Sequence, residues 1–276
     1  MEHSRSSYLA VFLTFARNSL VRDMTFRGNF LIQSASSVLW MGINLCFYIL
    51  IFGFTQEIGR DTGWHKYEFF AFLSTAMFVN SLMQAFVMPN AEKFSELIRT
   101  GNLDFALLKP IDTQFLISFQ RVEWSAFSNF VFGIVLLAYS LAQLDQMPGI
   151  AAIVLYPLYI LCGVSILYSL MICLAATSIW MGRNESLYNF WFYITNFSRY
   201  PMEIYRGPLG DPLRWLLTFI IPVLVAINVP ARFMAMPLRR DLWPLATFAI
   251  VATLGSLWVC RRVFRLSLRS YRSASS

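Results

Sequence analysis

Charged residues are scarce in this chain. Only 13% of its 276 residues are Asp, Glu, Lys or Arg, whereas 57% are hydrophobic and 26 are phenylalanine. An ordinary soluble domain is roughly a quarter charged. A soluble protein of this length would need a polar shell that these counts cannot supply, and the mean hydropathy of +0.56 indicates the same. We therefore expect most of the protein surface to face lipid.

Cysteine and histidine are too few and too scattered to indicate a metal site or a disulfide framework. The two histidines, His3 and His65, stand far apart and outside any HExxH pattern. The cysteines lie within or at the end of apolar runs and form no CxxC pair; they are Cys46, Cys162, Cys173 and Cys260. The sequence therefore predicts neither a metal site nor catalytic residues.

Lysine occurs only three times, at Lys66, Lys93 and Lys109, and never after a GxxxxG. A P-loop needs glycines whose amides cradle phosphate and a following lysine, so we do not expect this chain to hydrolyse ATP by that route. The net charge of +7 does not indicate nucleic acid either, because the arginines flank the apolar runs. That placement suits contact with lipid head groups and control of topology.

Stretches without charge mark the candidate membrane spans, since a helix needs about 20 apolar residues to cross the hydrocarbon. These stretches are 28–56, 69–91, 124–144, 146–182, 186–198, 215–231 and 242–260. The first four and the last are long enough to span. The fifth and sixth hold only 13 and 17 residues and are separated by RYPMEIYRGPLGDPLR.

We interpret 187–205 as a fifth span whose outer end is broken. Residues 212–235 would then form a re-entrant pair of short helices, bent at Pro222 and ended by Pro230. Irregular backbone at membrane depth must be buried in protein or line a wet cavity. The whole chain, 1–276, is thus predicted as one all-α domain with six spans and an outer re-entrant region over 199–240. The alternative is seven plain spans.

The arginine distribution favours six spans. Both the first 28 residues and the tail RRVFRLSLRSYR are rich in arginine, and the positive-inside rule places such segments in the cytoplasm. An odd number of spans would separate the two ends. The cost of this topology is a set of arginines on or near the outer side, namely Arg199, Arg206, Arg214, Arg232, Arg239 and Arg240.

The two ends of the chain have amphipathic patterns. Ser7 to Val21 predicts a helix with a broad apolar stripe, so 1–27 is expected to lie along the inner interface of the membrane. In the tail, arginines recur at three- and four-residue spacing. The simplest interpretation is that this stripe holds the helix end on anionic lipid, at about 1 kcal/mol for each arginine. These arginines are Arg262, Arg265, Arg269 and Arg272.

A polar segment, 91–112, separates the second and third predicted spans and would be cytoplasmic. Ala91 to Thr100 has helical periodicity, with Phe94, Leu97 and Ile98 on one face. We expect these three side chains to be exposed below the membrane, where burial in a partner would contribute about 1.5–3 kcal/mol each. Packing onto the chain's own N-terminal helix explains the spacing equally well.

Helix-ending residues divide this polar segment further. Gly101 is placed to end the first helix in a left-handed conformation. Asn102 or Asp104 would begin a second short turn, Phe105 to Leu108, which must stop before Pro110. Asp112 would then cap the third span. The sequence predicts two short helices at a sharp angle.

Several amides lie at membrane depth, where each needs a hydrogen-bonding partner. They either line a substrate path or join helices, and joining helices is the commoner use. Asn129 and Asn189 are two of them; the candidates for a path are Asn44, Asn80, Gln84 and Asn196. Near the outer end of the fifth span, Glu203 is expected to pair with Arg199 or Arg206.

The order of these parts resembles the type-2 permeases of ATP-binding-cassette exporters, and a bacterial branch loosely described as drug or antibiotic exporters in particular. The residues that carry the likeness are Ile98-Arg99-Thr100-Gly101-Asn102-Leu103-Asp104, Leu108-Lys109-Pro110, Phe197-Ser198-Arg199-Tyr200-Pro201, Ile221-Pro222 and Val229-Pro230-Ala231. The likeness covers nearly the whole chain.

The resemblance implies a permease in the bacterial inner membrane, with both termini cytoplasmic. It would work as a homodimer or related heterodimer with a separate cytoplasmic ATPase, which would hold the ATP and magnesium. The implied ATPase-coupling residues are Phe94, Leu97, Ile98, Arg99, Gly101, Leu103, Asp104, Lys109 and Pro110. The implied outer gate comprises Arg199, Tyr200, Pro201, Glu203, Pro222 and Pro230.

Two other function classes are compatible with the composition. A membrane enzyme acting on lipid-linked substrates would place its site at 199–214, but Glu203 and Asp211 stand there without a histidine, which is a poor set for acid–base work. A structural subunit that stabilises another membrane protein is the third class. For the exporter, the apolar and aromatic spans suit a lipid-like or amphipathic cargo.

Overall fold

The computed structural model describes residues 7–144, 147–181, 185–236 and 242–271, and within them the protein is almost entirely helical. The only β contact among these residues is an isolated bridge between Glu57 and His65. The all-α prediction is confirmed. Several residues named from the sequence, namely His3, Arg239, Arg240 and Arg272, lie outside the described residues.

The long helices are α1 (Tyr8–Thr25), α2 (Arg27–Phe54), α3 (Lys66–Leu82), α7 (Phe127–Gln143), α8 (Ile150–Ala176) and α13 (Leu242–Ser270). The short helices are α4 (Met88–Arg99), α5 (Leu103–Leu107), α6 (Thr113–Phe119), α9 (Ser178–Met181), α10 (Glu185–Asn196), α11 (Gly210–Trp215) and α12 (Val223–Ala235). Turns of π-helix follow α3 and α11, and turns of 3₁₀-helix precede α7 and follow α10.

Five helical segments are long and apolar enough to cross a membrane: Arg27–Phe54, Lys66–Arg99, Trp124–Gln143, Ile150–Trp180 and Leu242–Ser270. They coincide with the five long uncharged stretches of the sequence. A further pair, Gly210–Ile220 and Val223–Ala235, is bent by 88° at its break and raises the number to six if it counts as one span. The predicted bend at Pro222 is therefore present.

The segment predicted as a fifth span, 187–205, is broken in its second half, as expected. α10 has 12 residues, which corresponds to about 18 Å, so this helix by itself covers only part of the thickness of the hydrocarbon. Two 3₁₀ turns follow it, separated by Tyr200 in an extended conformation (φ −122°, ψ 151°). Tyr200 precedes Pro201, and a residue before proline is disfavoured in the helical region.

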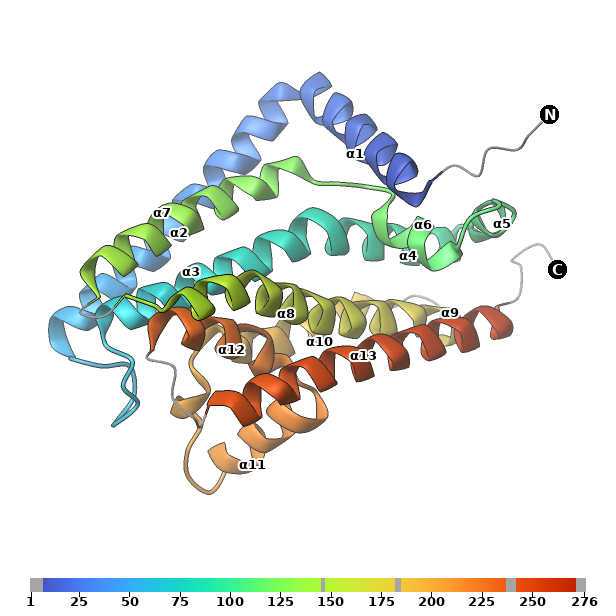
Figure 1. Cartoon of the computed structure of the whole chain (residues 1–276). Helices are drawn as coiled ribbons and strands as arrows, with labels where there is room; N and C mark the ends of the chain where they lie inside the picture. The colour runs from blue at the N-terminus through green and yellow to red at the C-terminus, as the bar shows by residue number, and fades with distance from the viewer. Residues whose placement is uncertain (1–6, 145–146, 182–184, 237–241, 272–276) are drawn as a thin grey trace.

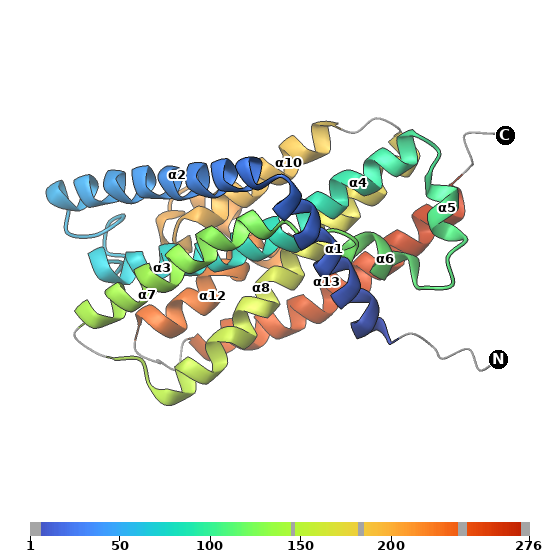
Figure 2. The same ribbon diagram turned by 90° about the horizontal axis from the view of Figure 1, so that it is seen from above.

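The helices form an elongated bundle with two distinct ends (Figure 1). We call the end that carries α5, the start of α1 and the end of α13 the α5 end, and the end that carries α11 and the 57–65 loop the α11 end. α1 lies across the bundle at a steep angle to α2 (Figure 2). The first described helix thus begins, and the last one finishes, at the same end of the bundle.

α12 occupies the centre of the bundle. Every residue of it except Arg232 is buried, and it packs against α3, α8 and α13. The expectation that Pro230 ends this helix is wrong, because α12 continues to Ala235. Pro230 has no N–H to donate to the carbonyl of Ala226 one turn earlier. That carbonyl instead faces Gly163 of α8, where a Cβ atom would stand 2.1 Å from the oxygen.

Replacing Gly163 by alanine should therefore destabilise the protein. The added methyl group would collide with the Ala226 backbone, which cannot move without disturbing α12. Overpacking of this kind costs about 1–3 kcal/mol, so the thermal unfolding midpoint in detergent should fall by several degrees.

Gly255→Ala in α13 is the matched control, because a Cβ atom there meets nothing within 4 Å. Alanine favours a helix over glycine by about 1 kcal/mol, so this variant should be as stable as the parent or more so. Equal unfolding midpoints for the Gly163→Ala and Gly255→Ala proteins would contradict the close approach of α8 and α12.

Candidate functional site

The first part of the predicted polar segment, 91–99, continues α3 and does not form a separate helix. A π-helical turn, Met83–Val87, joins α3 to α4, and the whole stretch Lys66–Arg99 runs as one helical segment. Pro89 lies in the first turn of α4 and has no N–H for the carbonyl of Ala85. The amide of Glu123 donates to that carbonyl instead, at 2.9 Å.

The helix-ending residues act largely as predicted. Gly101 follows α4 with a φ of 72°, the left-handed conformation that glycine adopts without strain. α5 begins after Asn102, whose side chain makes no cap to the helix. The side chain of Asp112 accepts the amide of Phe115 at 3.0 Å. This cap starts the short α6, however, and not the third span, which begins near Trp124.

The predicted apolar face of α4 is covered by the chain itself. Phe94 is fully buried and its ring lies 5.7 Å from that of Phe264 on α13. The expectation that Phe94 is exposed is therefore wrong, and its partner is the last helix rather than the N-terminal one. Leu97 and Ile98 are half-buried beside the same core.

α5 and Leu108, the residue that follows it, expose apolar side chains at this end. Phe105 is 68% exposed and Leu108 81% exposed, whereas Leu103 is fully buried. Arg99, Lys109 and Pro110 are also exposed. Asp104 lies beside Tyr271, and burial together with this carboxylate raises the pKa of the Tyr271 phenol.

A polar network that the sequence argument missed ties α6 to α13. The guanidinium of Arg261 donates to Asp112 Oδ1 at 3.1 Å and to Gln114 Oε1 at 2.8 Å, and it also pairs with Asp112 Oδ2. These hydrogen bonds from Arg261 hold the pKa of Asp112 below its usual range, against partial burial. Gln114 in turn donates to the hydroxyl of Tyr168 on α8 at 3.1 Å.

At the α11 end, Glu203 is buried and its ion-pair partner is not the predicted one. It pairs with Arg232 of α12, and the indole of Trp64 donates to its other oxygen at 2.9 Å. The expected pairing with Arg199 or Arg206 is therefore wrong. Arg199 lies over the ring of Phe192, 5.6 Å from its centroid.

Further contacts fix the loops around this ion pair. The buried side chain of Asn228 on α12 accepts the amide of Met202 at 2.8 Å. Arg206 donates to the carbonyls of Arg60 and Asp61, at 3.2 and 3.3 Å. In the 57–65 loop, the carboxylate of Glu57 accepts hydrogen bonds from backbone amides of the same loop. These hydrogen bonds, and that from Gly63 above all, lower the pKa of Glu57.

Among the predicted gate residues, Tyr200 is partly exposed, Pro201 is buried and Pro222 lies at the bend of the α11–α12 pair. Pro230, the remaining proline of this set, lies inside α12 and is buried. The structure therefore brings Glu203 together with α12, but through Arg232 and Asn228, which stand outside the predicted set. The contacts Met202–Asn228 and Glu203–Arg232 join residues 26 and 29 positions apart. Helical or strand spacing cannot predict such contacts, because the intervening segment is irregular.

The predicted path amides are not joined to one another by any hydrogen bond among the described residues. Asn44 donates to the carbonyl of Trp40 in its own helix at 2.8 Å. Gln84 is exposed and Asn80 half-buried, whereas the side-chain oxygen of Asn196 is buried without a partner. The described residues also contain no group of three His, Cys, Asp or Glu side chains that could hold a metal ion.

Comparison with known proteins gives one match. The family model described as ABC-2 family transporter protein matches residues 38–275, which is most of the chain. No curated protein matches the chain, and no solved structure does so either.

The Glu203–Arg232 pair should be a large contributor to the stability of the α11 end. Glu203→Gln leaves the Arg232 guanidinium without its carboxylate in a buried position, and breaking a buried pair costs about 3–5 kcal/mol. The thermal unfolding midpoint should fall accordingly. Replacing both residues, as Glu203→Gln with Arg232→Met, should recover part of the loss, because no uncompensated charge remains.

Arg206→Gln serves as the control, since it removes a charged side chain from the same end of the bundle but leaves Glu203 paired with Arg232. Its effect should stay within about 1 kcal/mol, as expected for exposed contacts. A fall in the Glu203→Gln midpoint no larger than that of Arg206→Gln would refute the importance of the buried pair.

Proposed function

The chain belongs to the ABC-2 family of transporter proteins, and on that premise we propose that it is the membrane permease subunit of an ATP-driven exporter. A separate cytoplasmic ATPase supplies the energy, and the cargo is a lipid-like or amphipathic molecule moved out of the cytoplasm or inner leaflet. The observation that supports this most directly is the exposed apolar surface of α5, located at the same end as the start of α1 and the end of α13.

In this proposal, α5 and the end of α4 form the coupling element that docks on the ATPase. Phe105 and Leu108 supply the contact, and burial of each would contribute about 1.5–3 kcal/mol. Leu97, Ile98, Arg99, Lys109 and Pro110 flank it. The buried side chains of Phe94 and Leu103 attach the element to the bundle, Gly101 ends α4 before α5 begins, and Asp104 lies in the first turn of α5.

The coupling element is connected to the transmembrane part at two points. The ring of Phe94 lies against that of Phe264, and Asp112 is held by Arg261. Both partners lie on α13, which packs against α8 and α12. A displacement of the ATPase surface would therefore move the last span and, through it, the central helix.

The proposed topology places the α5 end in the cytoplasm and the α11 end outside a bacterial inner membrane. α1 would then lie along the inner interface, and the α11–α12 pair would be a re-entrant hairpin that closes the outer end of the path. The arginine-rich ends of the chain support this orientation.

A second permease, either another copy or a related chain, completes the proposed transporter. α2 supports this part, because Tyr48 is the only buried residue among its 28. Such an exposed apolar helix needs lipid or another subunit as neighbour. The path amides Asn44, Asn80, Gln84 and Asn196 remain candidates for its lining.

The alternative of a membrane enzyme with a site at 199–214 is less well supported. The carboxylate of Glu203 is already engaged by Trp64 and Arg232, and the segment contains no histidine for acid–base work. A structural subunit without turnover is distinguished from an exporter by measuring nucleotide-linked transport.

Replacing Phe105 and Leu108 together by aspartate should abolish docking. The full-length chain, expressed in its native membrane and extracted in mild detergent, should bring down a stoichiometric ATPase, and the double variant should lose it together with stimulated ATP hydrolysis. Leu209→Asp is the matched control, because Leu209 is 88% exposed at the opposite end. Retention of the ATPase by the double variant would refute the coupling role of α5.

Arg261→Gln should uncouple the transporter without dissociating it. The variant loses the hydrogen bonds to Asp112 and Gln114 but keeps the α5 surface, so the ATPase should still co-purify while transport per ATP hydrolysed falls several-fold. Arg265→Gln, an exposed arginine one turn away on α13, should behave like the parent. Normal transport by Arg261→Gln would show that this contact does not carry the coupling.

A further inference from the structure

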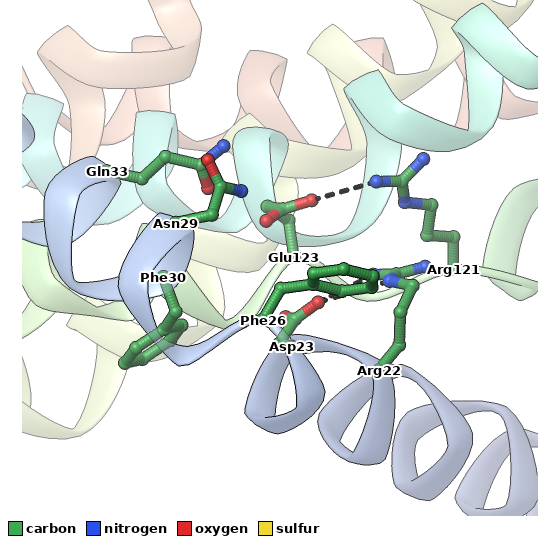
Figure 3. A pocket seen from close by; sticks show the side chains of 8 residues that line it. All are labelled: Arg22, Asp23, Phe26, Asn29, Phe30, Gln33, Arg121 and Glu123. Carbon is green, nitrogen blue, oxygen red and sulfur yellow. Dashed lines mark hydrogen bonds and ion pairs between the residues drawn. The ribbon is translucent and has the colours of Figure 1, made fainter.

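A pocket of about 220 Å³ lies where α1, the first turns of α2 and the 121–123 segment meet. Two arginines, two carboxylates, two amides and two phenylalanine rings line it (Figure 3). Sites for drug-sized ligands are commonly larger, about 300–1,000 Å³, so this pocket suits a small polar group. None of the roles proposed above uses it.

The cations of the pocket are engaged to different degrees. Arg22 donates to Asp23 Oδ1 at 2.9 Å and to the carbonyl of Val122 at 3.4 Å. Among the described residues, the guanidinium of Arg121 contacts only Glu123, at the long distance of 3.5 Å, and its Nε is buried without a partner. The guanidinium of Arg121 therefore has donors to spare, in a planar arrangement that matches the oxygens of a phosphate.

The two carboxylates of the pocket also differ in how many hydrogen bonds they make and in how buried they are. Asp23 is buried, and its second oxygen accepts the amide of Trp124 at 3.3 Å, so this side chain is fully used in holding the pocket together. Glu123 is about a quarter exposed and its side chain accepts two weak hydrogen bonds, from Ser125 at 3.3 Å and from Arg121 at 3.5 Å. Arg121 and Glu123 therefore lie side by side as a cation and an anion that can each make further hydrogen bonds to a ligand.

The 121–123 segment is rigidly mounted. The side chain of Asn90, which is buried, accepts the amide of Arg121 at 2.8 Å and donates to its carbonyl at 2.6 Å. Together with the bond from the Glu123 amide to Ala85, these contacts present Arg121 and Glu123 in a fixed geometry. Such preorganisation reduces the entropy lost when a ligand binds.

The position of the pocket along the chain places it at the boundary of the hydrocarbon. Arg22 and Asp23 come shortly before the uncharged stretch 28–56, and Glu123 directly precedes the uncharged stretch 124–144. Phe26, which lines the pocket, is 66% exposed, and Leu31, further along α2, is 64% exposed. A molecule held here would have its polar group among the charges and its apolar part along α2.

We propose that this pocket binds the head group of a zwitterionic phospholipid with a primary amine. Arg121 receives the phosphate and Glu123 the ammonium group, which donates hydrogen bonds that a quaternary amine cannot supply. The inference rests on the proposed membrane placement of the α1–α2 junction, but not on transport or on the ATPase.

The test measures lipid binding to the full-length chain. Protein purified and stripped of lipid in detergent is supplied with phosphatidylethanolamine, phosphatidylcholine or phosphatidylglycerol of identical acyl chains, and the bound lipid is quantified by native mass spectrometry. Phosphatidylethanolamine should bind roughly tenfold more tightly than phosphatidylcholine, the ratio expected of one hydrogen bond between charged groups. Equal binding of these two lipids would overturn the proposal, and so would preference for phosphatidylglycerol.

Two variants assign the preference to the pocket. Glu123→Gln should reduce the binding of phosphatidylethanolamine to the level of phosphatidylcholine, and Arg121→Gln should weaken both. Arg17→Gln on α1 and Glu92→Gln on α4 make the same changes of charge at exposed positions of the same end and should retain the preference. If the controls lose the preference as the pocket variants do, the pocket is not the site.

Soluble phosphoethanolamine distinguishes a lipid from a free phosphate ester. It carries the same head group without acyl chains and should not compete at concentrations equal to that of the lipid. Competition at equal concentration would assign the site to a soluble metabolite and overturn the lipid assignment. The ATPase co-purification experiment is independent of these readings, so failure of either proposal leaves the other open to its own test.

Discussion

The contact between the Ala226 carbonyl and Gly163 is the constraint on which the rest of the structure depends. Pro230 leaves that carbonyl without its helical hydrogen bond, and only a residue without a Cβ atom allows α8 to approach it so closely. α12 can therefore lie buried in the centre of the bundle. From there it presents Asn228 to the 200–204 segment and Arg232 to Glu203, which in turn holds Trp64.

A second proline, Pro89, also leaves a helical carbonyl without its hydrogen bond. Pro89 frees the carbonyl of Ala85, and the amide of Glu123, 38 residues away in the sequence, satisfies it. Backbone groups near the hydrocarbon must find partners within the protein. At both prolines, the helix therefore gains a fixed neighbour. Gly163 of α8 lies against the helix that carries the proposed gate residue Pro230, and Glu123 of the proposed lipid site lies against the helical segment that carries Pro89.

α13 connects the two ends. It begins beside α12 near the α11 end and finishes beside α4 and α6, where Phe264 and Arg261 contact them. One long helix thus touches the proposed coupling element and the buried centre, which gives a physical route between docking of an ATPase and movement at the opposite end. The polar contacts along it are few, so each has a defined role that substitution can test.

The sequence by itself determined the all-α class, the five long apolar segments, the left-handed Gly101, the cap at Asp112 and the bend at Pro222, because these depend on local composition and backbone sterics. Tertiary structure decided which partners these elements meet. Periodicity places Phe94, Leu97 and Ile98 on one face, but it does not show that α13 covers Phe94. Nor does it show that Phe105 and Leu108 remain exposed. The pairing of Glu203 with Arg232 likewise arises because a bent, buried helix returns to an irregular loop, and no local pattern encodes a contact between distant segments.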